Sequence, residues 1–182
     1  MKIPVLYGSI REGRKSEAVA KFIHAELLKR GIESEYVAPE QYKEMEPLEH
    51  KHPEPWKTIM EQADGLIIVT PEYNHGYPGA VKEMIDALTT EFAHKPVGII
   101  GAGGFSGGMR VVEQLRQVVI EQKMVPIREA GYFPMIWELL DEKGELKNPD
   151  QYIPRLEPFF KELFWYAEVL KEGREKHPWT EK

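Results

Sequence analysis

The fold is decided by one stretch of the sequence, Gly65-Leu66-Ile67-Ile68-Val69-Thr70, which runs directly into Pro71-Glu72-Tyr73-Asn74. The first part is apolar at successive positions, so both of its faces are suited to burial. This pattern is typical of a central strand in a parallel sheet, because helices then cover both faces of the strand. The second part is rich in turn-forming residues and marks the carboxyl end of that strand. The stretch therefore predicts an α/β protein.

Outward from this strand, strand-like and helix-like segments alternate in both directions along the chain. Short apolar runs indicate strands, and apolar residues at helical spacing indicate helices. We expect strands over residues 3–7, 32–38, 65–70, 97–101 and 125–129, and helices over residues 16–30, around 56–60, and over 79–92, 108–122 and 153–175. This alternation predicts an open parallel sheet covered by helices on both faces. At 182 residues, the chain is expected to form a single domain over residues 1–182.

Composition excludes several classes of function. The sequence contains no cysteine, which excludes disulfides, thiolate metal sites and a thiol nucleophile. A formal net charge of −6 makes the chain a poor candidate for tracking a nucleic-acid backbone. No apolar run approaches the ~18 residues of a membrane span, and the first residues lead straight into a strand. We therefore expect a cytoplasmic protein with no nucleic-acid and no membrane partner.

Ligands of such sheets bind beyond the carboxyl ends of the strands, where the strand order reverses. The first loop at such an end reads Gly8-Ser9-Ile10-Arg11-Glu12-Gly13-Arg14-Lys15-Ser16 and opens a helix. A helix N-terminus offers unpaired N–H groups and a positive dipole end, and the serines and arginine add donors that suit phosphate. The alternative is a solvated basic loop with Ser16 as a simple helix cap. The spacing does not match a P-loop or a Gly-x-Gly-x-x-Gly motif.

The second loop, residues 71–79, is longer than most strand-to-helix connections. Its prolines and glycines indicate a rigid turn whose backbone groups, with Tyr73 and Tyr77, can face a planar heterocycle; the alternative is a structural connector. Gly76 and Gly79 would resist β-branched substitution if they sit at positive φ or against such a ring. His75 is either a proton donor to a reduced acceptor or, the simpler alternative, a residue that shapes the loop.

The third loop, residues 102–108, has four glycines in seven residues, so it either admits a ligand close to the backbone or is a flexible link.

The sequence gives little indication of a metal site. Only His50 and His52, flanked by Glu49 and Glu54, resemble a metal cluster, and a solvated charged loop is the better interpretation. We also expect no nucleophile elbow of the hydrolase type. A site without an evident acid–base pair suits a cofactor that carries the chemistry itself.

These motifs resemble those of the NADPH-dependent FMN reductase family. The similarity rests on Gly8-Ser9-Ile10-Arg11, on Pro71-Glu72-Tyr73-Asn74, on the helix opened by Pro78-Gly79-Ala80-Val81-Lys82-Glu83-Met84-Ile85-Asp86, and on Ser106-Gly107-Gly108-Met109-Arg110. The resemblance implies a flavodoxin-like three-layer sandwich with a five-stranded parallel sheet in the order 2-1-3-4-5. It also implies FMN as cofactor and NADPH or NADH as co-substrate.

Carried over position by position, the resemblance implies three groups of cofactor-binding residues. Ser9, Arg11 and Ser16 would hold the FMN phosphate, and Arg14 or Lys15 would share that role. Pro71, Glu72, Tyr73 and Asn74 would line the isoalloxazine ring, largely through backbone groups, while Gly103, Gly104 and Ser106 would close its far side. Ser106 would stand in for a hydroxyl residue that many relatives carry where Ala102 stands here. No catalytic side chain and no metal is assigned.

The implied activity is hydride transfer from NAD(P)H to bound flavin and then to a quinone, azo compound, free flavin or similar acceptor, in ping-pong order. Two alternatives stay open: a flavodoxin-type electron carrier without NAD(P)H oxidation, and a flavin-free binding domain. The first is disfavoured by the modest net charge and by the arginine in the phosphate loop. The final helix carries Phe164 and Trp165 beside its core-facing stripe, and this, with the family resemblance, predicts a homodimer or homotetramer.

Overall fold

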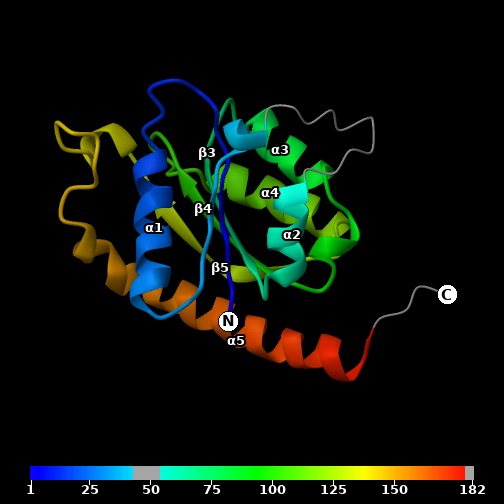
Figure 1. The fold of residues 1–182 in the computed structure, drawn as a ribbon. Helices are drawn as coiled ribbons and strands as arrows, with labels where there is room; N and C mark the ends of the chain where they lie inside the picture. Colours follow the sequence, from blue (N-terminus) through cyan, green and yellow to red (C-terminus); the bar gives the residue numbers. More distant parts are fainter. Residues whose placement is uncertain (43–53, 179–182) are drawn as a thin grey trace.

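The computed structural model describes residues 1–42 and 54–178. These residues contain a five-stranded parallel sheet with helices around it (Figure 1). The order β2-β1-β3-β4-β5 is the one that the family resemblance implied. The strands are β1 (Val5–Tyr7), β2 (Tyr36–Val37), β3 (Leu66–Pro71), β4 (Pro96–Ala102) and β5 (Val125–Phe133). Every residue of β3 and β4 is buried, as the apolar runs predicted for central strands.

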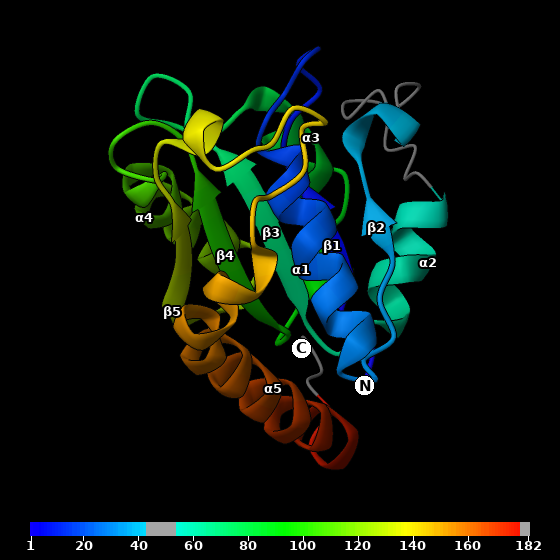
Figure 2. The ribbon, with the colours of Figure 1, turned by 90° about the vertical axis from the view of Figure 1, so that its left-hand side faces the viewer.

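Helices cover both faces of this sheet and produce three layers. They are α1 (Glu17–Lys29), α2 (Glu54–Gln62), α3 (Gly79–Asp86), α4 (Met109–Glu121) and α5 (Ile153–Lys176), with short 3-10 helices η1 (Pro39–Tyr42), η3 (Thr90–Phe92), η4 (Ile136–Glu138) and η5 (Pro149–Tyr152). One hydrophobic core lies between the sheet and the pair α1 and α5, which Figure 2 shows on the same face. A second core lies under α2, α3 and α4 on the other face. The expected sandwich is confirmed.

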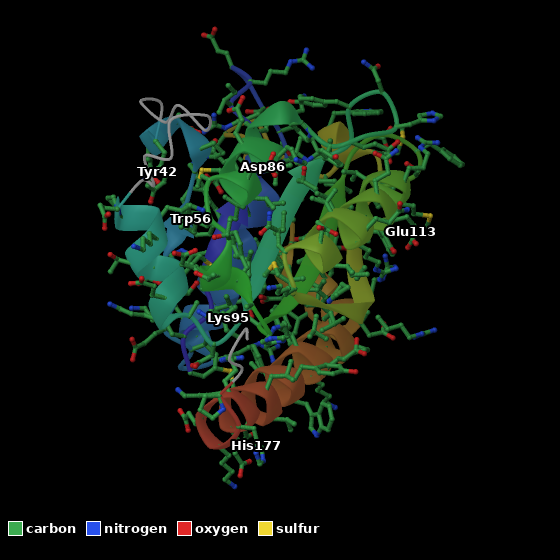
Figure 3. The ribbon with its side chains drawn as sticks, turned by 90° about the vertical axis from the view of Figure 1, so that its right-hand side faces the viewer. Tyr42, Trp56, Asp86, Lys95, Glu113 and His177 are labelled. Carbon is green, nitrogen blue, oxygen red and sulfur yellow. The ribbon has the colours of Figure 1, made fainter. Side chains whose placement is uncertain are left out.

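Close packing fixes these layers at particular side chains. Trp56 of α2 is fully buried, and its indole N–H donates to the carbonyl of Met84 on α3 at 2.9 Å (Figure 3). Its ring also meets Phe92 edge to face, with centroids 6.0 Å apart. On the opposite face, a Cβ built on Gly98 of β4 would lie 2.7 Å from Cε2 of Phe159. The absence of a side chain at Gly98 therefore lets α5 approach the centre of the sheet.

Three elements have clearly different bounds from those predicted. The strand expected over residues 32–38 is only Tyr36–Val37. The helix expected over residues 79–92 ends at Asp86, and η3 follows after a break, although Leu88 and Phe92 remain buried. Burial at those positions therefore reflects packing of a loop and a 3-10 turn, not one continuous helix. The last strand runs to Phe133 and not to residue 129, and its pairing with β4 shifts register between Val97 and Ile99. This irregularity interrupts the alternation of buried and exposed side chains from which the length of a strand is predicted.

The carboxyl ends of the parallel strands meet at one edge of the sheet, and the loops of residues 8–16, 71–79 and 102–108 leave from there. Among the described residues, no helix is long and apolar enough to cross a membrane. The same residues contain no cluster of three or more candidate metal ligands. Glu49, His50 and His52 lie outside the described part of the chain.

Candidate functional site

A pocket of about 310 Å³ opens at the carboxyl edge of the sheet, between the three loops. This volume falls at the lower end of the range of small-molecule sites. All three loops contribute to its wall, as does the segment after β5. The lining residues are Arg11, Glu12, Gly13, Arg14, Lys15, Ser16, Pro71, Glu72, Tyr73, Ala102, Gly103, Gly104, Ile136 and Trp137.

The first loop brings the amino end of α1 to this pocket. Ser16, at the N-cap position, is buried but makes no side-chain capping hydrogen bond. Its Oγ lies instead 3.0 Å from the hydroxyl of Tyr7, at the end of β1. The interpretation of Ser16 as a simple helix cap is therefore wrong. At the start of α1, the backbone N–H groups of Ala18 and Val19 donate to the carbonyls of Lys15 and Ser16, at 3.4 and 3.2 Å. The pocket therefore meets the positive end of the helix dipole through Lys15 and Ser16, which line it.

Ser9 and Arg11 of the first loop differ in burial. Ser9 is fully buried and is not part of the pocket wall; its Oγ lies 2.8 Å from the hydroxyl of Tyr73 and accepts the backbone N–H of Arg11 at 3.3 Å. Ser9 therefore joins the first loop to the second. Arg11 and Lys15 are exposed at the pocket, where their cationic heads can meet an anion.

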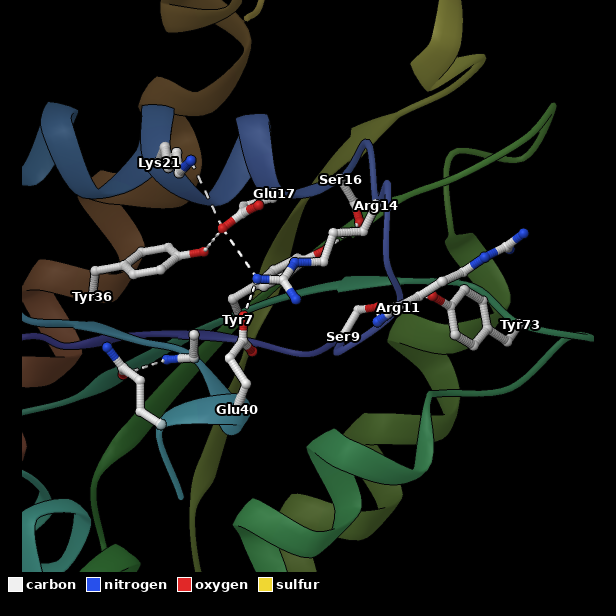
Figure 4. Close-up of polar contacts among 12 residues, drawn as sticks. Tyr7, Ser9, Arg11, Arg14, Ser16, Glu17, Lys21, Tyr36, Glu40 and Tyr73 are labelled. Carbon is white, nitrogen blue, oxygen red and sulfur yellow. Dashed lines mark hydrogen bonds and ion pairs between the residues drawn. The ribbon is translucent and has the colours of Figure 1, made fainter. Parts of the chain in front are cut away.

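Arg14 lies in the pocket wall, but its guanidinium is already paired with carboxylates of the protein (Figure 4). Its guanidinium forms ion pairs with Glu17, at 3.3 Å, and with Glu40 of η1. The same group lies over the ring of Tyr7, 5.1 Å from the ring centroid. Sharing a ligand phosphate would require Arg14 to leave two carboxylates, so Arg11 and Lys15 are the cations available for that role.

The second loop begins with a tight two-residue turn. Tyr73 and Gly76 exchange both backbone hydrogen bonds at 2.9 Å, and between them Asn74 and His75 have φ values of 49° and 69°. The left-handed backbone therefore falls on Asn74 and His75. Gly76 and Gly79 do not have positive φ, so that condition for their sensitivity to β-branched substitution is not met, and a Cβ on Gly79 would meet nothing within 4 Å.

His75 lies away from the pocket. Its side chain is exposed and does not line the cavity, while its carbonyl accepts a hydrogen bond from the side chain of Gln114 at 2.8 Å. These positions favour a loop-shaping role over that of a proton donor. Asn74 is likewise outside the lining.

Glu72 connects the second loop to the start of α4. Only 6% of its side chain is exposed, and its carboxylate accepts the backbone N–H of Arg110 at 3.2 Å and the Arg110 Nε–H at 2.6 Å. The hydroxyl of Ser106 donates to the same carboxylate at 3.4 Å. A carboxylate at a helix N-terminus is stabilised by the exposed N–H groups and the helix dipole. Glu72 and Ser106 therefore hold the loops together, and Glu72 presents its backbone to the pocket.

The third loop is ordered by backbone contacts to the chain after β5. Gly103 donates to the carbonyl of Phe133 at 3.1 Å and accepts from Ile136 at 3.0 Å, and Gly104 accepts from Met135 at 2.9 Å. The next two glycines of the loop, at positions 107 and 108, have positive φ, and a Cβ on either would come within 3.0 Å of neighbouring backbone. The glycines thus serve close packing, and the alternative of a flexible link is wrong.

Residues 104–108 of this loop do carry the Gly-x-Ser-x-Gly spacing of a hydrolase nucleophile elbow, which the sequence analysis did not expect. The hydroxyl of Ser106, however, contacts the Glu72 carboxylate and accepts from Arg110 Nη2 at 3.3 Å. A serine nucleophile needs an adjacent general base, usually a histidine. The partners of Ser106 indicate a structural hydroxyl, so the spacing alone does not indicate hydrolysis.

Seven of the ten predicted binding residues line the pocket together: Arg11, Ser16, Pro71, Glu72, Tyr73, Gly103 and Gly104. Ser9 and Ser106 lie behind the wall, and Asn74 lies at the turn outside it. Sequence reasoning missed Ile136 and Trp137, which follow β5. The sequence position of these two residues could have indicated them, because β5 also ends at the carboxyl edge of the sheet. They were missed because that strand was predicted to end too early.

The sequence matches the NADPH-dependent FMN reductase family over residues 1–138. The chain belongs to this family. It is 33% identical to an NADPH azoreductase of Bacillus sp. (strain OY1-2) over 97% of this chain and 98% of the relative. A 64-residue segment, 32% of this chain and 34% of the relative, is 45% identical to a quinone reductase of Escherichia coli (strain K12). Membership gives FMN as the cofactor and NAD(P)H as the source of reducing equivalents, so the chain is an NAD(P)H-dependent flavoenzyme.

Solved structures agree on the fold. The flavoenzyme NAD(P)H:(acceptor) oxidoreductase FerB from Paracoccus denitrificans superposes with a TM-score of 0.70 at 20% identity, covering 94% of this chain and 97% of that one. A flavodoxin from Pseudomonas aeruginosa, in a cysteine-to-alanine mutant form, gives a TM-score of 0.58 at 19% identity, covering 94% of this chain and 99% of that one. Carriers and enzymes thus share this flavodoxin-like architecture, and family membership separates this chain from the carriers.

The donor set of the pocket fits FMN at both of its ends. One end has a helix N-terminus, a serine hydroxyl and two exposed cations, which suit a phosphate. The other end has the backbone of residues 71–73 and 102–104 with the ring of Trp137, which suit a planar aromatic group. Trp137 is 47% exposed, so its indole is accessible to a ligand.

The link between Glu72 and Arg110 generates a stability prediction. Glu72→Ala removes a buried carboxylate from the start of α4 and should lower the free energy of unfolding by about 1–2 kcal/mol. Glu113→Ala is the matched control, because Glu113 lies on the same helix, pairs with Arg116 and has a side chain 64% exposed. That control should change the unfolding free energy by less than about 0.5 kcal/mol. Urea unfolding of both variants measures the difference, and equal midpoints would contradict a structural role for Glu72.

Proposed function

We propose that this chain oxidises NAD(P)H and reduces a planar aromatic acceptor, such as a quinone, an azo compound or a free flavin, in a ping-pong sequence. The proposal rests on one observation: three loops whose chemistry suits the two ends of FMN line a single pocket in a member of this reductase family. The azoreductase and quinone reductase relatives support the class of acceptor.

In this proposal different loops bind different parts of the cofactor. Ser16, Arg11, Lys15 and the amino end of α1 hold the phosphate, and the backbone of residues 71–73 and 102–104 holds the ring. The serine at position 9 supports the first loop, and the contact between residues 72 and 106 supports the third. When bound, FMN supplies the redox chemistry by taking a hydride from NAD(P)H and delivering electrons to the acceptor.

The protein's part in the reaction is orientation and exclusion of water. Pro71 and Ala102 are buried and lie opposite each other on paired strands, so the wall they form is rigid. Trp137, which lines the pocket and is partly exposed, supplies apolar surface for a second aromatic molecule. Hydride transfer between stacked rings depends mainly on such positioning and needs no protein acid or base.

Steady-state kinetics test the function against the electron-carrier alternative. The FMN-loaded protein should oxidise NADPH continuously when a soluble quinone is present, because both half-reactions occur at one site. A flavodoxin-type carrier would show almost no NADPH consumption under the same conditions. Purified protein that takes up no FMN would instead support a flavin-free binding domain.

Arg11 tests the placement of the phosphate. Arg11→Ala should weaken FMN binding by about tenfold or more, the scale of a hydrogen bond to a charged group, because its exposed guanidinium lies at the pocket. Arg128→Ala changes the net charge equally at a side chain that is 84% exposed and outside the pocket lining, so it serves as the control. Fluorescence titration of the apoprotein measures both, and an unchanged FMN dissociation constant in Arg11→Ala would reject the assignment.

We also propose that the chain assembles as a homodimer or homotetramer. Trp165 and Val169 on α5 are 58% and 42% exposed, and Phe105 at the third loop is 93% exposed. Trp165 and Val169 are four residues apart on α5 and therefore lie on one face of that helix, where a second chain would cover them. Light scattering at micromolar concentration should give two or four times the chain mass of 21.1 kDa. A monomer mass would remove the proposal.

A further inference from the structure

Tyr7 lies directly behind the phosphate end of the pocket, yet it is not part of the pocket wall. It is fully buried at the end of β1, and its hydroxyl lies 3.0 Å from Ser16 Oγ. Ser16, by contrast, lines the cavity. The buried tyrosine therefore reaches the ligand space through the serine hydroxyl (Figure 4).

The chemistry of the two hydroxyls gives their hydrogen bond a direction. Burial raises the pKa of Tyr7 to about 12, so its phenol stays protonated at neutral pH. A phenolic O–H is a stronger donor than an aliphatic one, and a serine oxygen is the better acceptor. When Tyr7 donates, the single hydrogen of Ser16 is left to point elsewhere, and the pocket is the open direction.

A second serine, Ser9, also interacts with the Tyr7 hydroxyl and acts to lower the pKa of that phenol. Ser9 Oγ is already engaged by the Tyr73 hydroxyl at 2.8 Å and by the backbone N–H of Arg11 at 3.3 Å. It also lies outside the pocket lining. Ser16 is therefore the hydroxyl that connects Tyr7 to the pocket.

A charged cluster keeps Tyr7 in this position from the other side. Arg14 covers the Tyr7 ring and is itself held by Glu17 and Glu40. Tyr36 donates to Glu17 at 3.2 Å, which completes the cluster. The cluster therefore fixes the ring of Tyr7 and, with it, the direction in which the phenolic hydroxyl points.

We propose that Tyr7 is a positioning residue that orients the Ser16 hydroxyl as a hydrogen-bond donor to the phosphate of FMN. This inference rests on the proposed placement of the FMN phosphate at the first loop. It assigns a binding role to a buried aromatic side chain that would otherwise count as core packing.

Comparing the binding of FMN and of riboflavin separates this positioning role from a packing role. FMN and riboflavin share the ring system, but only FMN carries the phosphate, so the ratio of their dissociation constants isolates the phosphate contact. Tyr7→Phe keeps the ring beneath Arg14 and should weaken FMN binding to the apoprotein by about tenfold, while riboflavin binding changes less than about twofold. Tyr36→Phe removes another hydroxyl of the same cluster that does not reach the pocket, and it should leave both constants unchanged.

A double-mutant cycle then tests the route through Ser16. Ser16→Ala should lose FMN affinity as Tyr7→Phe does, and the double variant should bind FMN no more weakly than Ser16→Ala alone. Additive losses would overturn the inference, as would equal losses for FMN and riboflavin, which would indicate a packing role. If Tyr7→Phe does not fold by circular dichroism, Ser16→Ala decides: unchanged FMN affinity overturns the proposal.

The same titrations distinguish the role of Tyr7 from the proposed placement of the FMN phosphate. A wild-type protein that binds FMN much more tightly than riboflavin, together with a Tyr7→Phe variant that does the same, contradicts the inference alone. A wild-type protein that binds FMN and riboflavin equally contradicts the placement of the phosphate as well.

Discussion

The position of β1 in the sheet is the constraint on which the site depends. Because β1 pairs with β2 on one side and β3 on the other, all in parallel, the connections after β1 and β3 leave the carboxyl edge in opposite directions. The space between them cannot be covered by either connection. The loops of residues 8–16 and 71–79 border that space, and the hydrogen bond between Ser9 and Tyr73 joins them beneath it. The pocket is therefore a consequence of strand order before any side chain is considered.

The charged residues around the pocket form two groups: some are paired within the protein, and others are exposed to a ligand. Arg14 is balanced by Glu17 and Glu40, and the arginine at the start of α4 is balanced by the nearly buried Glu72. Breaking such partly buried pairs leaves an uncompensated charge, so these arginines are costly to redirect. The cations at positions 11 and 15 are exposed at the pocket mouth. The loops can thus stay rigid while a small number of cations is available to an anionic group.

Local sequence patterns predicted the parallel sheet and the three loops that border the pocket, whereas the strand order and the individual binding residues were implied by the family resemblance. Apolar runs located β3 and β4, and glycine, proline and serine marked the loops that follow strands. The failures have a common physical cause. Arg14 finds Glu40 across 26 residues and Glu72 finds Arg110 across 38, and no local pattern reports such a contact. Trp137 was missed because the register shift in β5 concealed where that strand ends. The left-handed turn fell on residues 74 and 75, although a glycine stood beside them.

We propose that FMN held in this pocket exchanges electrons with NAD(P)H and with the acceptor in separate steps. Anaerobic rapid mixing of the FMN-loaded protein with NADPH tests it most directly, with no acceptor present. If the two steps are separate, the visible flavin absorbance falls on mixing with NADPH alone and returns when a quinone is added afterwards. An absorbance that NADPH alone leaves unchanged, or that falls only when the quinone is already present, would contradict electron exchange in separate steps.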